Sequence, residues 1–155
     1  MSKRLSMALI KPLAYPSPPV KLWTPDAIGL ITFLLGFPGG LAMAILNWIR
    51  MGLISKAISH LVAGAAGTLA YVILLAQLTG DDVRLLAFLV NIAMITYLHN
   101  QMGQDIAAFK ACNHEVQNAH WLGGILIGIV MFGLILALAF VVGVFMALLN
   151  VPIPE

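Results

Sequence analysis

The sequence predicts an all-α integral membrane protein with four transmembrane helices in an up-down bundle. The chain has 155 residues, of which 61% are hydrophobic and only 9% are charged, whereas a soluble domain carries about 25% charged residues. Most of the apolar residues fall into four long segments, which short stretches with turn-forming and charged residues separate. This composition leaves too little polar surface for a soluble fold, and the length allows one membrane domain.

The two ends of the chain are expected to lie outside this domain, which covers residues 24–150. Residues 1–23 form a basic, proline-rich tail, and each proline fixes its own φ and restricts the residue before it. This tail would either lie on the surface or dock as an extended arm on a partner. Residues 151–155 form a second, short tail.

The first span is expected over residues 25–49. Thr24 can cap a helix, Pro25 suits its first position, and Asp26 favours the positive end of the helix dipole. Pro38 lies in the middle of this segment and removes one backbone hydrogen bond. We therefore expect a spanning helix kinked at Pro38, with a re-entrant hairpin as the alternative.

Three further spans are expected at about residues 57–78, 83–112 and 120–149. The third continues past the membrane as an extramembrane extension, because no helix-breaking residue interrupts it before Asn113. With four spans, both termini lie on one side, and the distribution of Lys and Arg places them in the cytoplasm.

Small residues recur at helical spacing and predict close helix packing. Gly124 and Gly128 lie four residues apart, so they share a helix face. We expect this face to contact a protein neighbour, either the Ala63/Gly67 surface of the second span or an adjacent subunit. The residues predicted to pack helices are Gly36, Gly40, Gly64, Gly67, Gly124 and Gly128.

Four spans would bring the first and third connections, and with them all four histidines, to one membrane face. One interpretation of this face is a solvated surface that contacts lipid head groups or a partner through Asn47, Trp48, Arg50, Gln104 and Asp105. A second is a haem or metal site, and the candidate cofactor ligands are His60, His99, His114 and His120, with Cys112 and Glu115 nearby. Their spacing matches no established ligand motif.

A third interpretation is a site for a quinone or another small polar substrate. Polar residues inside a membrane mark functional paths, and here these are Thr68, Tyr71, Gln77, Asn91, Thr96 and Tyr97. The span centres carry no ionisable acid or amine, which argues against a proton pump or an ion-coupled carrier. The sequence also lacks the basic patches of nucleic-acid-binding proteins and the motifs of nucleophilic hydrolases.

The segment that follows Trp23 resembles small uncharacterised bacterial membrane proteins. In these, a tryptophan-proline start precedes a first helix that contains glycines and a proline and ends in Asn-Trp plus a basic residue. The matching residues are Trp23, Pro25, Gly36, Pro38, Gly40, Asn47, Trp48 and Arg50. The resemblance implies a four-helix membrane protein and assigns no chemistry.

We therefore expect a non-catalytic accessory or structural subunit, or an interaction protein, of a membrane assembly. Its expected partners are membrane lipids and other membrane subunits, with no nucleic acid and no required cofactor. The alternative is a redox subunit that carries haem or quinone.

Overall fold

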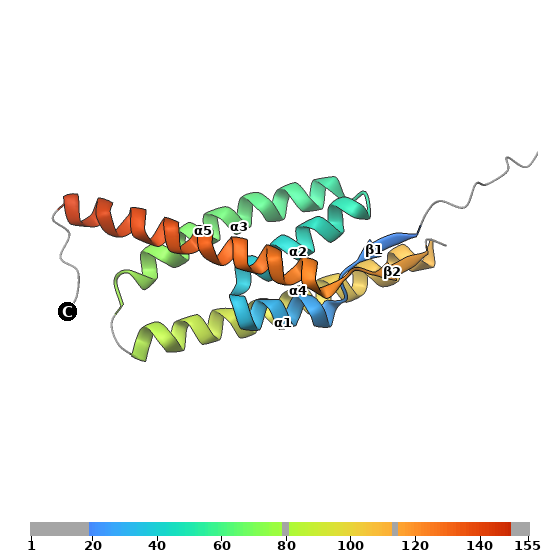
Figure 1. The fold of residues 1–155 in the computed structure, drawn as a ribbon, viewed down its shortest axis with the longest axis horizontal. Coiled ribbons are helices and arrows are strands. Elements are labelled where there is room, and N and C mark those ends of the chain that lie inside the picture. The colour runs from blue at the N-terminus through green and yellow to red at the C-terminus, as the bar shows by residue number, and fades with distance from the viewer. Residues whose placement is uncertain (1–18, 79–80, 113–114, 150–155) are drawn as a thin grey trace, which may run out of the picture.

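The computed structural model describes residues 19–78, 81–112 and 115–149, which form five helices and two short strands (Figure 1). The predicted tail residues 1–18, His114 and the C-terminal residues 150–155 lie outside the described residues. Three long helices run along the molecule and two short helices lie between them. The elements in chain order are β1 (Val20–Leu22), α1 (Pro25–Leu35), α2 (Phe37–Arg50), α3 (Ile54–Leu75), α4 (Asp81–Ala111), β2 (Val116–Asn118) and α5 (Trp121–Leu148).

Three of these helices, α3, α4 and α5, are long and apolar enough to cross a membrane. Their bounds lie within three residues of the second, third and fourth predicted spans, because the length of each apolar segment and the turn-forming residues around it mark their ends. The helices of the first predicted span have 11 and 14 residues. At about 1.5 Å per residue they are roughly 17 and 21 Å long, too short for a hydrocarbon core of about 30 Å.

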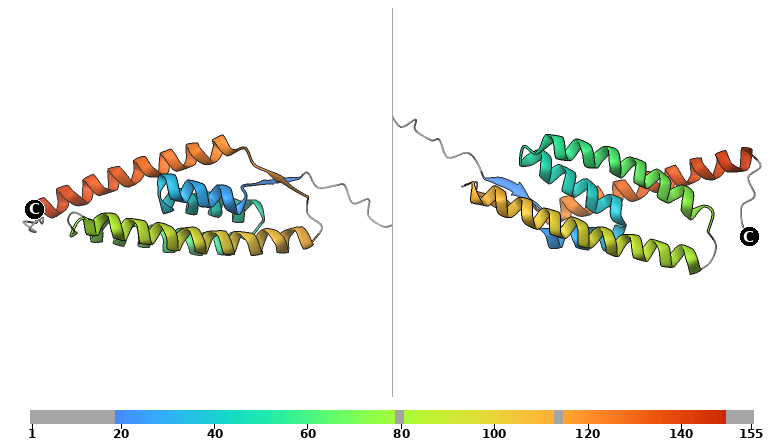
Figure 2. Two further views of the ribbon diagram at one scale, coloured as in Figure 1. Left: turned by 90° about the horizontal axis from the view of Figure 1, so that it is seen from below. Right: turned by 180° about the vertical axis from the view of Figure 1, so that it is seen from behind.

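The first predicted span is a helical hairpin rather than one kinked helix. Thr24 caps α1, accepting a hydrogen bond from the amide of Ala27, and α1 ends at Gly36, whose φ is +86°. Glycine adopts this left-handed conformation without the steric cost that a Cβ brings. Pro38 then lies in the first turn of α2, where a helix needs no amide donor. The chain reverses between α1 and α2, so Pro38 starts a helix instead of kinking one (Figure 2).

The tip of this hairpin lies partway along the long helices, and both of its open ends point toward the end that carries β1 and β2 (Figure 1). Asn91 of α4 holds the tip, because its Oδ1 accepts a hydrogen bond from the amide of Phe37 at 2.9 Å. This amide has no partner within α2 at a helix N-terminus. The side chain of Asn91 therefore supplies the acceptor that water would supply in a soluble protein.

The hairpin forms the core of the molecule. Four residues of α1 and nine of α2 are buried, among them Ile28, Thr32 and Trp48. Each of the three long helices buries only two residues. The long helices thus surround the hairpin, and most of their own surface faces outward.

Glycines set the closest approaches to the hairpin. A Cβ on Gly39 would lie 3.1 Å from the Cα of Gly128, and a Cβ on Gly124 would lie 2.6 Å from Cε of Met43. A Cβ on Gly128 would also collide with Leu35. The predicted glycine pair of α5 therefore packs on the hairpin, rather than on the Ala63/Gly67 surface of α3.

The other predicted packing glycines have three different environments. A Cβ on Gly40 would collide with Thr32, and one on Gly64 would collide with Leu41. Gly36 forms the hairpin turn. Gly67 is exposed, and no heavy atom of the described chain lies within 4 Å of a Cβ position there.

A short parallel strand pair is an unexpected element. β1 pairs with β2 in the register Val20↔Val116, and Leu22 at the end of β1 and Trp23 after it are buried. The end of the predicted tail thus docks on the connection before α5, far away in sequence. The strand pair lies at one end of the bundle, while α5 ends at the opposite end (Figure 1).

Candidate functional site

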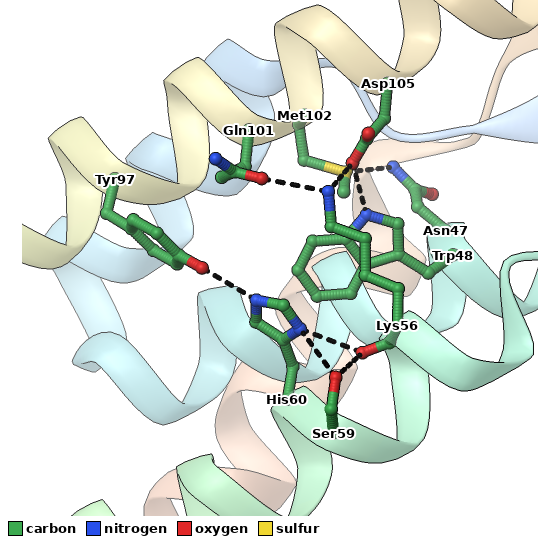
Figure 3. Close-up of polar contacts among 9 residues, drawn as sticks. All are labelled: Asn47, Trp48, Lys56, Ser59, His60, Tyr97, Gln101, Met102 and Asp105. Atoms are coloured by element: carbon green, nitrogen blue, oxygen red, sulfur yellow. Dashed lines mark hydrogen bonds and ion pairs between the residues drawn. The ribbon is translucent and has the colours of Figure 1, made fainter.

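Polar side chains from α2, α3 and α4 meet at the end of the bundle near the strand pair, and we call this group the polar cluster (Figure 3). Helical spacing produces it, because residues four apart share a helix face. Lys56 and His60 lie four apart on α3, and Tyr97, Gln101 and Asp105 continue at the same interval on α4. The full cluster is Asn47, Trp48, Lys56, Ser59, His60, Tyr97, Gln101, Met102 and Asp105.

An ion pair lies at the centre of the polar cluster. Nζ of Lys56 is 2.7 Å from Oδ2 of Asp105, and their side chains are 28% and 18% exposed. The same oxygen accepts a hydrogen bond from Nε1 of Trp48 at 2.6 Å. Nζ of Lys56 also donates to the amide oxygen of Gln101 at 2.9 Å. Each charge therefore has a charged partner and a second polar contact, which offsets its partial removal from water.

The hydrogen bonds of His60 determine which of its ring nitrogens carries the proton. Nδ1 lies 2.8 Å from the carbonyl oxygen of Lys56, and a carbonyl only accepts. Nδ1 of the neutral ring is therefore protonated, so Nε2 accepts a hydrogen bond from the hydroxyl of Tyr97 at 2.7 Å. The ring also packs on Trp48, with the centroids 4.3 Å apart. These contacts fix both nitrogens and leave the Tyr97 oxygen with acceptor capacity.

Asn47 connects the polar cluster to the N-terminal strand. Its side chain is fully buried. Oδ1 accepts from the amide of Trp23 at 3.0 Å, and Nδ2 donates to the carbonyl of Trp23 at 2.8 Å. The guanidinium of Arg50 lies over the Trp23 ring, 4.3 Å from its centroid. Both contacts hold the end of β1 against α2.

The predicted cofactor histidines have separate partners. His60 bonds to Tyr97, whereas Nε2 of His99 lies 3.1 Å from Oδ1 of Asp26. His120 caps α5 through Nδ1, and His114 lies outside the described residues. In the part of the chain that the structure describes, no three His, Cys, Asp or Glu residues lie together as metal ligands would. The described histidines share one end of the bundle without forming a common site.

The residues predicted for the polar face have different outcomes. Asn47, Trp48 and Asp105 belong to the polar cluster, and Arg50 contacts Trp23 beside it. Gln104 is exposed instead. Lys56, Tyr97 and Gln101 join them, and the sequence did not predict the contacts among these side chains. Their signal is the four-residue spacing on two neighbouring helices, which becomes informative once the helices are known to face each other.

A cleft of about 630 Å³ continues from the polar cluster between α3 and α4. His60 and Tyr97, which belong to the polar cluster, line one end of the cleft. Farther along α3, its wall is made of Ala63, Gly67 and Ala70. Phe37 and Leu41 of α2 also line it, and Tyr71 packs edge-on against Phe37 with the ring centroids 5.4 Å apart.

The site combines a charge-compensated polar end with a long apolar cleft. It offers hydrogen bonding and apolar contact to a ligand. Searches with this chain found no matching family model, no matching curated protein and no matching solved structure.

Proposed function

We propose that this chain is a three-span membrane protein with a re-entrant hairpin, and that it acts as a non-catalytic accessory or interaction subunit. Three helices are long enough to cross a bilayer. The hairpin breaks its helix at Gly36, and broken backbone is tolerated at membrane depth only where protein covers it. The packing of α4 and α5 on the hairpin, together with Asn91 at its tip, supplies that cover.

The proposed topology also assigns an orientation. Among the described residues, Lys21, Arg50, Lys56 and Lys110 lie toward the end with the strand pair, and Arg84 lies toward the other. Lys and Arg accumulate on the cytoplasmic side of membrane proteins. We therefore place the polar cluster toward the cytoplasm. The sequence analysis predicted that both termini lie in the cytoplasm, which requires an even number of crossings. In the topology proposed here, three crossings place the end of α5 on the opposite side of the membrane.

Thiol labelling tests this orientation, because Cys112 is the single cysteine and is exposed. An impermeant maleimide should label Cys112 only after the cells are lysed. In a variant that combines Cys112→Ser with Leu149→Cys, the same maleimide should label position 149 in intact cells. Labelling of Cys112 in intact cells would contradict the proposed orientation.

The observation that carries the interaction function is an unused packing surface on α5. Gly133 has no heavy atom of the described chain within 4 Å of a Cβ position, and Phe140 on the same helix is 74% exposed. Gly133 and Ala137 lie four residues apart, so they share a face. In lipid, close packing at small residues drives helix association more than hydrophobicity does. We propose that this face binds a helix of another membrane subunit.

Photo-crosslinking in the native membrane tests the proposed interface. A photoreactive phenylalanine analogue at Phe140 should give a discrete protein adduct, and the same analogue at Phe88 of α4, which is 55% exposed, serves as the matched control. The double variant Gly133→Leu and Ala137→Leu should abolish the Phe140 adduct and leave the purified chain equally stable. Adducts to lipid alone, or an adduct that survives both leucines, would contradict an interface here.

The alternative function is a redox subunit that carries haem or quinone. A haem held between His60 and His99 would have to displace Tyr97 from one histidine and Asp26 from the other. A visible spectrum and metal analysis of the purified chain separate the two functions. A Soret band, or iron in a one-to-one ratio to protein, would favour the redox subunit over the accessory role.

A further inference from the structure

We propose that the cleft between α3 and α4 binds one neutral amphiphile with a hydroxyl-bearing head, such as an alkylated hydroquinone. The head would lie against Tyr97 and the apolar body would extend along α3. This site goes beyond the proposed accessory role, and it involves binding without electron transfer. Its test uses the purified chain, so the outcome does not depend on the α5 interface.

The shape of the cleft follows from small residues on one wall. Ala63, Gly67 and Ala70 lie at intervals of three and four on α3, so they face the cleft together. A Cβ on Gly67 would meet no atom within 4 Å. The resulting volume of about 630 Å³ lies in the range of small-molecule sites, about 300–1,000 Å³. The space is therefore large enough for a ring with an alkyl chain.

The distribution of polar atoms gives the cleft a direction. Ser59, His60 and Tyr97 of the polar cluster line one end of the cleft. Toward Leu74 and Val90 the wall becomes apolar, and the hydroxyl of Tyr71 is the one polar side-chain group that the cleft lining carries there. An amphiphile matches this pattern when its head lies at the cluster and its chain points away. A second groove of about 440 Å³ between α2, α3 and α5 has only Thr68 as a polar lining residue, and Thr68 bonds its own helix.

The charges at the polar end favour a neutral head. Lys56 is paired with Asp105 and also donates to Gln101. A charged head group would have to disrupt this pair, or remain without a counterion in a partly desolvated place. A neutral ligand leaves the ion pair intact.

The hydrogen-bond pattern favours a head that donates. The N–H at Nδ1 of His60 donates a hydrogen bond to the carbonyl of Lys56, and Nε2 accepts a hydrogen bond from the hydroxyl of Tyr97. The Tyr97 oxygen therefore has acceptor capacity but no remaining proton to donate. A hydroxyl group on the ligand satisfies it, whereas an ether of the same shape cannot.

Equilibrium binding to the purified full chain in detergent tests this proposal. The probes are radiolabelled 2-decyl-1,4-hydroquinone, kept reduced, and its dimethyl ether, with decanol as a competitor. We expect one saturable hydroquinone site per chain and about tenfold weaker binding of the ether, because one hydrogen bond is lost. Competition by decanol at equal concentration would assign the site to aliphatic alcohols and support the hydroxyl requirement, and its absence would assign the site to ring-bearing ligands.

Variants of the cleft locate the bound head. Tyr97→Phe should weaken hydroquinone binding about tenfold and leave the ether unchanged. Tyr71→Phe is the matched control, since it removes a hydroxyl elsewhere in the same cleft, and it should have no effect. Gly67→Leu should block both probes without lowering thermal stability, with Ala63→Leu as a second blocking variant. Equal affinity for hydroquinone and ether, equal effects of the two tyrosine variants, or binding that survives both leucines would overturn the proposal.

Discussion

The α1–α2 hairpin and the three long helices are both apolar, but the rest of the described chain covers them very differently. Nine of the fourteen residues of α2 are buried, against two of the twenty-eight residues of α5. Phe140 and Leu148 of α5 are 74% and 75% exposed. In water, such a difference would leave α5 unstable. In lipid, an apolar side chain on the surface costs little, so burial is needed only where the backbone is broken.

The same comparison explains where glycine matters. Gly124 and Gly128 lie against the hairpin, whereas Gly133 and Gly143 of the same helix have open space. Identical residues on one helix thus have different roles, and the hairpin decides which. Four predictions test this contrast, in order of decreasing expected effect.

The largest effect is expected from adding side chains where α5 packs on the hairpin. The double variant Gly124→Leu and Gly128→Leu should destabilise the protein by about 1–3 kcal/mol per site, because the new side chains collide with Met43 and Leu35. The matched variant Gly133→Leu and Gly143→Leu should be as stable as the parent or slightly more stable. Thermal unfolding in detergent measures both. Equal losses in the two variants would show that the hairpin is not the packing partner.

The next largest effect on stability is expected from removing the side-chain amide of Asn47. Asn47→Ala leaves the amide and the carbonyl of Trp23 without partners, which should cost about 3 kcal/mol. The N-terminal strand should also become sensitive to protease. Gln104→Ala, at an exposed position, should change stability by less than about 0.5 kcal/mol. Retained protection of the strand in Asn47→Ala would contradict this role.

Truncating a side chain of the hairpin core should have a moderate effect. Met43 is 1% exposed, and Met43→Ala should cost about 2 kcal/mol because it leaves a cavity. Leu136 of α5 is 56% exposed, so Leu136→Ala removes contacts that lipid can replace. Unfolding free energies measured in the same detergent compare the two, and a larger loss at Leu136 would reverse the proposed difference between hairpin and long helices.

The smallest effect is expected from the ion pair of the polar cluster. A double-mutant cycle with Lys56→Met and Asp105→Asn should give a coupling of about 1 kcal/mol, because the pair is mostly shielded from water. The pair Asp81–Arg84 is a control with side chains 99% and 85% exposed, and its coupling should be near zero. Equal coupling in both pairs would show that the cluster contributes no more than a surface contact.

Several features of the fold could be predicted from the sequence because they depend on neighbouring residues. Thr24, Pro25 and Asp26 mark a helix start whatever lies around them, and α1 begins there. The bounds of α3, α4 and α5 follow from apolar length and from turn-forming residues. The sequence predicted that many polar groups of the candidate site share one membrane face, but it did not predict their contacts. Lys56 and Asp105 are 49 residues apart in the chain and meet only because α3 and α4 face each other.

The sequence by itself determined that this chain belongs in a membrane, since hydrocarbon-like composition and segment length are local properties. Only the tertiary structure decided whether Gly36 and Pro38 kink a helix or reverse the chain. Glycine and proline occur in both arrangements: a kinked helix loses one backbone hydrogen bond at Pro38, whereas a new helix can start there without that loss. The hairpin becomes stable because Asn91, Gly128 and the other residues around it cover its broken backbone. Asn91 and Gly128 lie outside residues 25–50, so the pattern of that segment alone could not choose between the two arrangements.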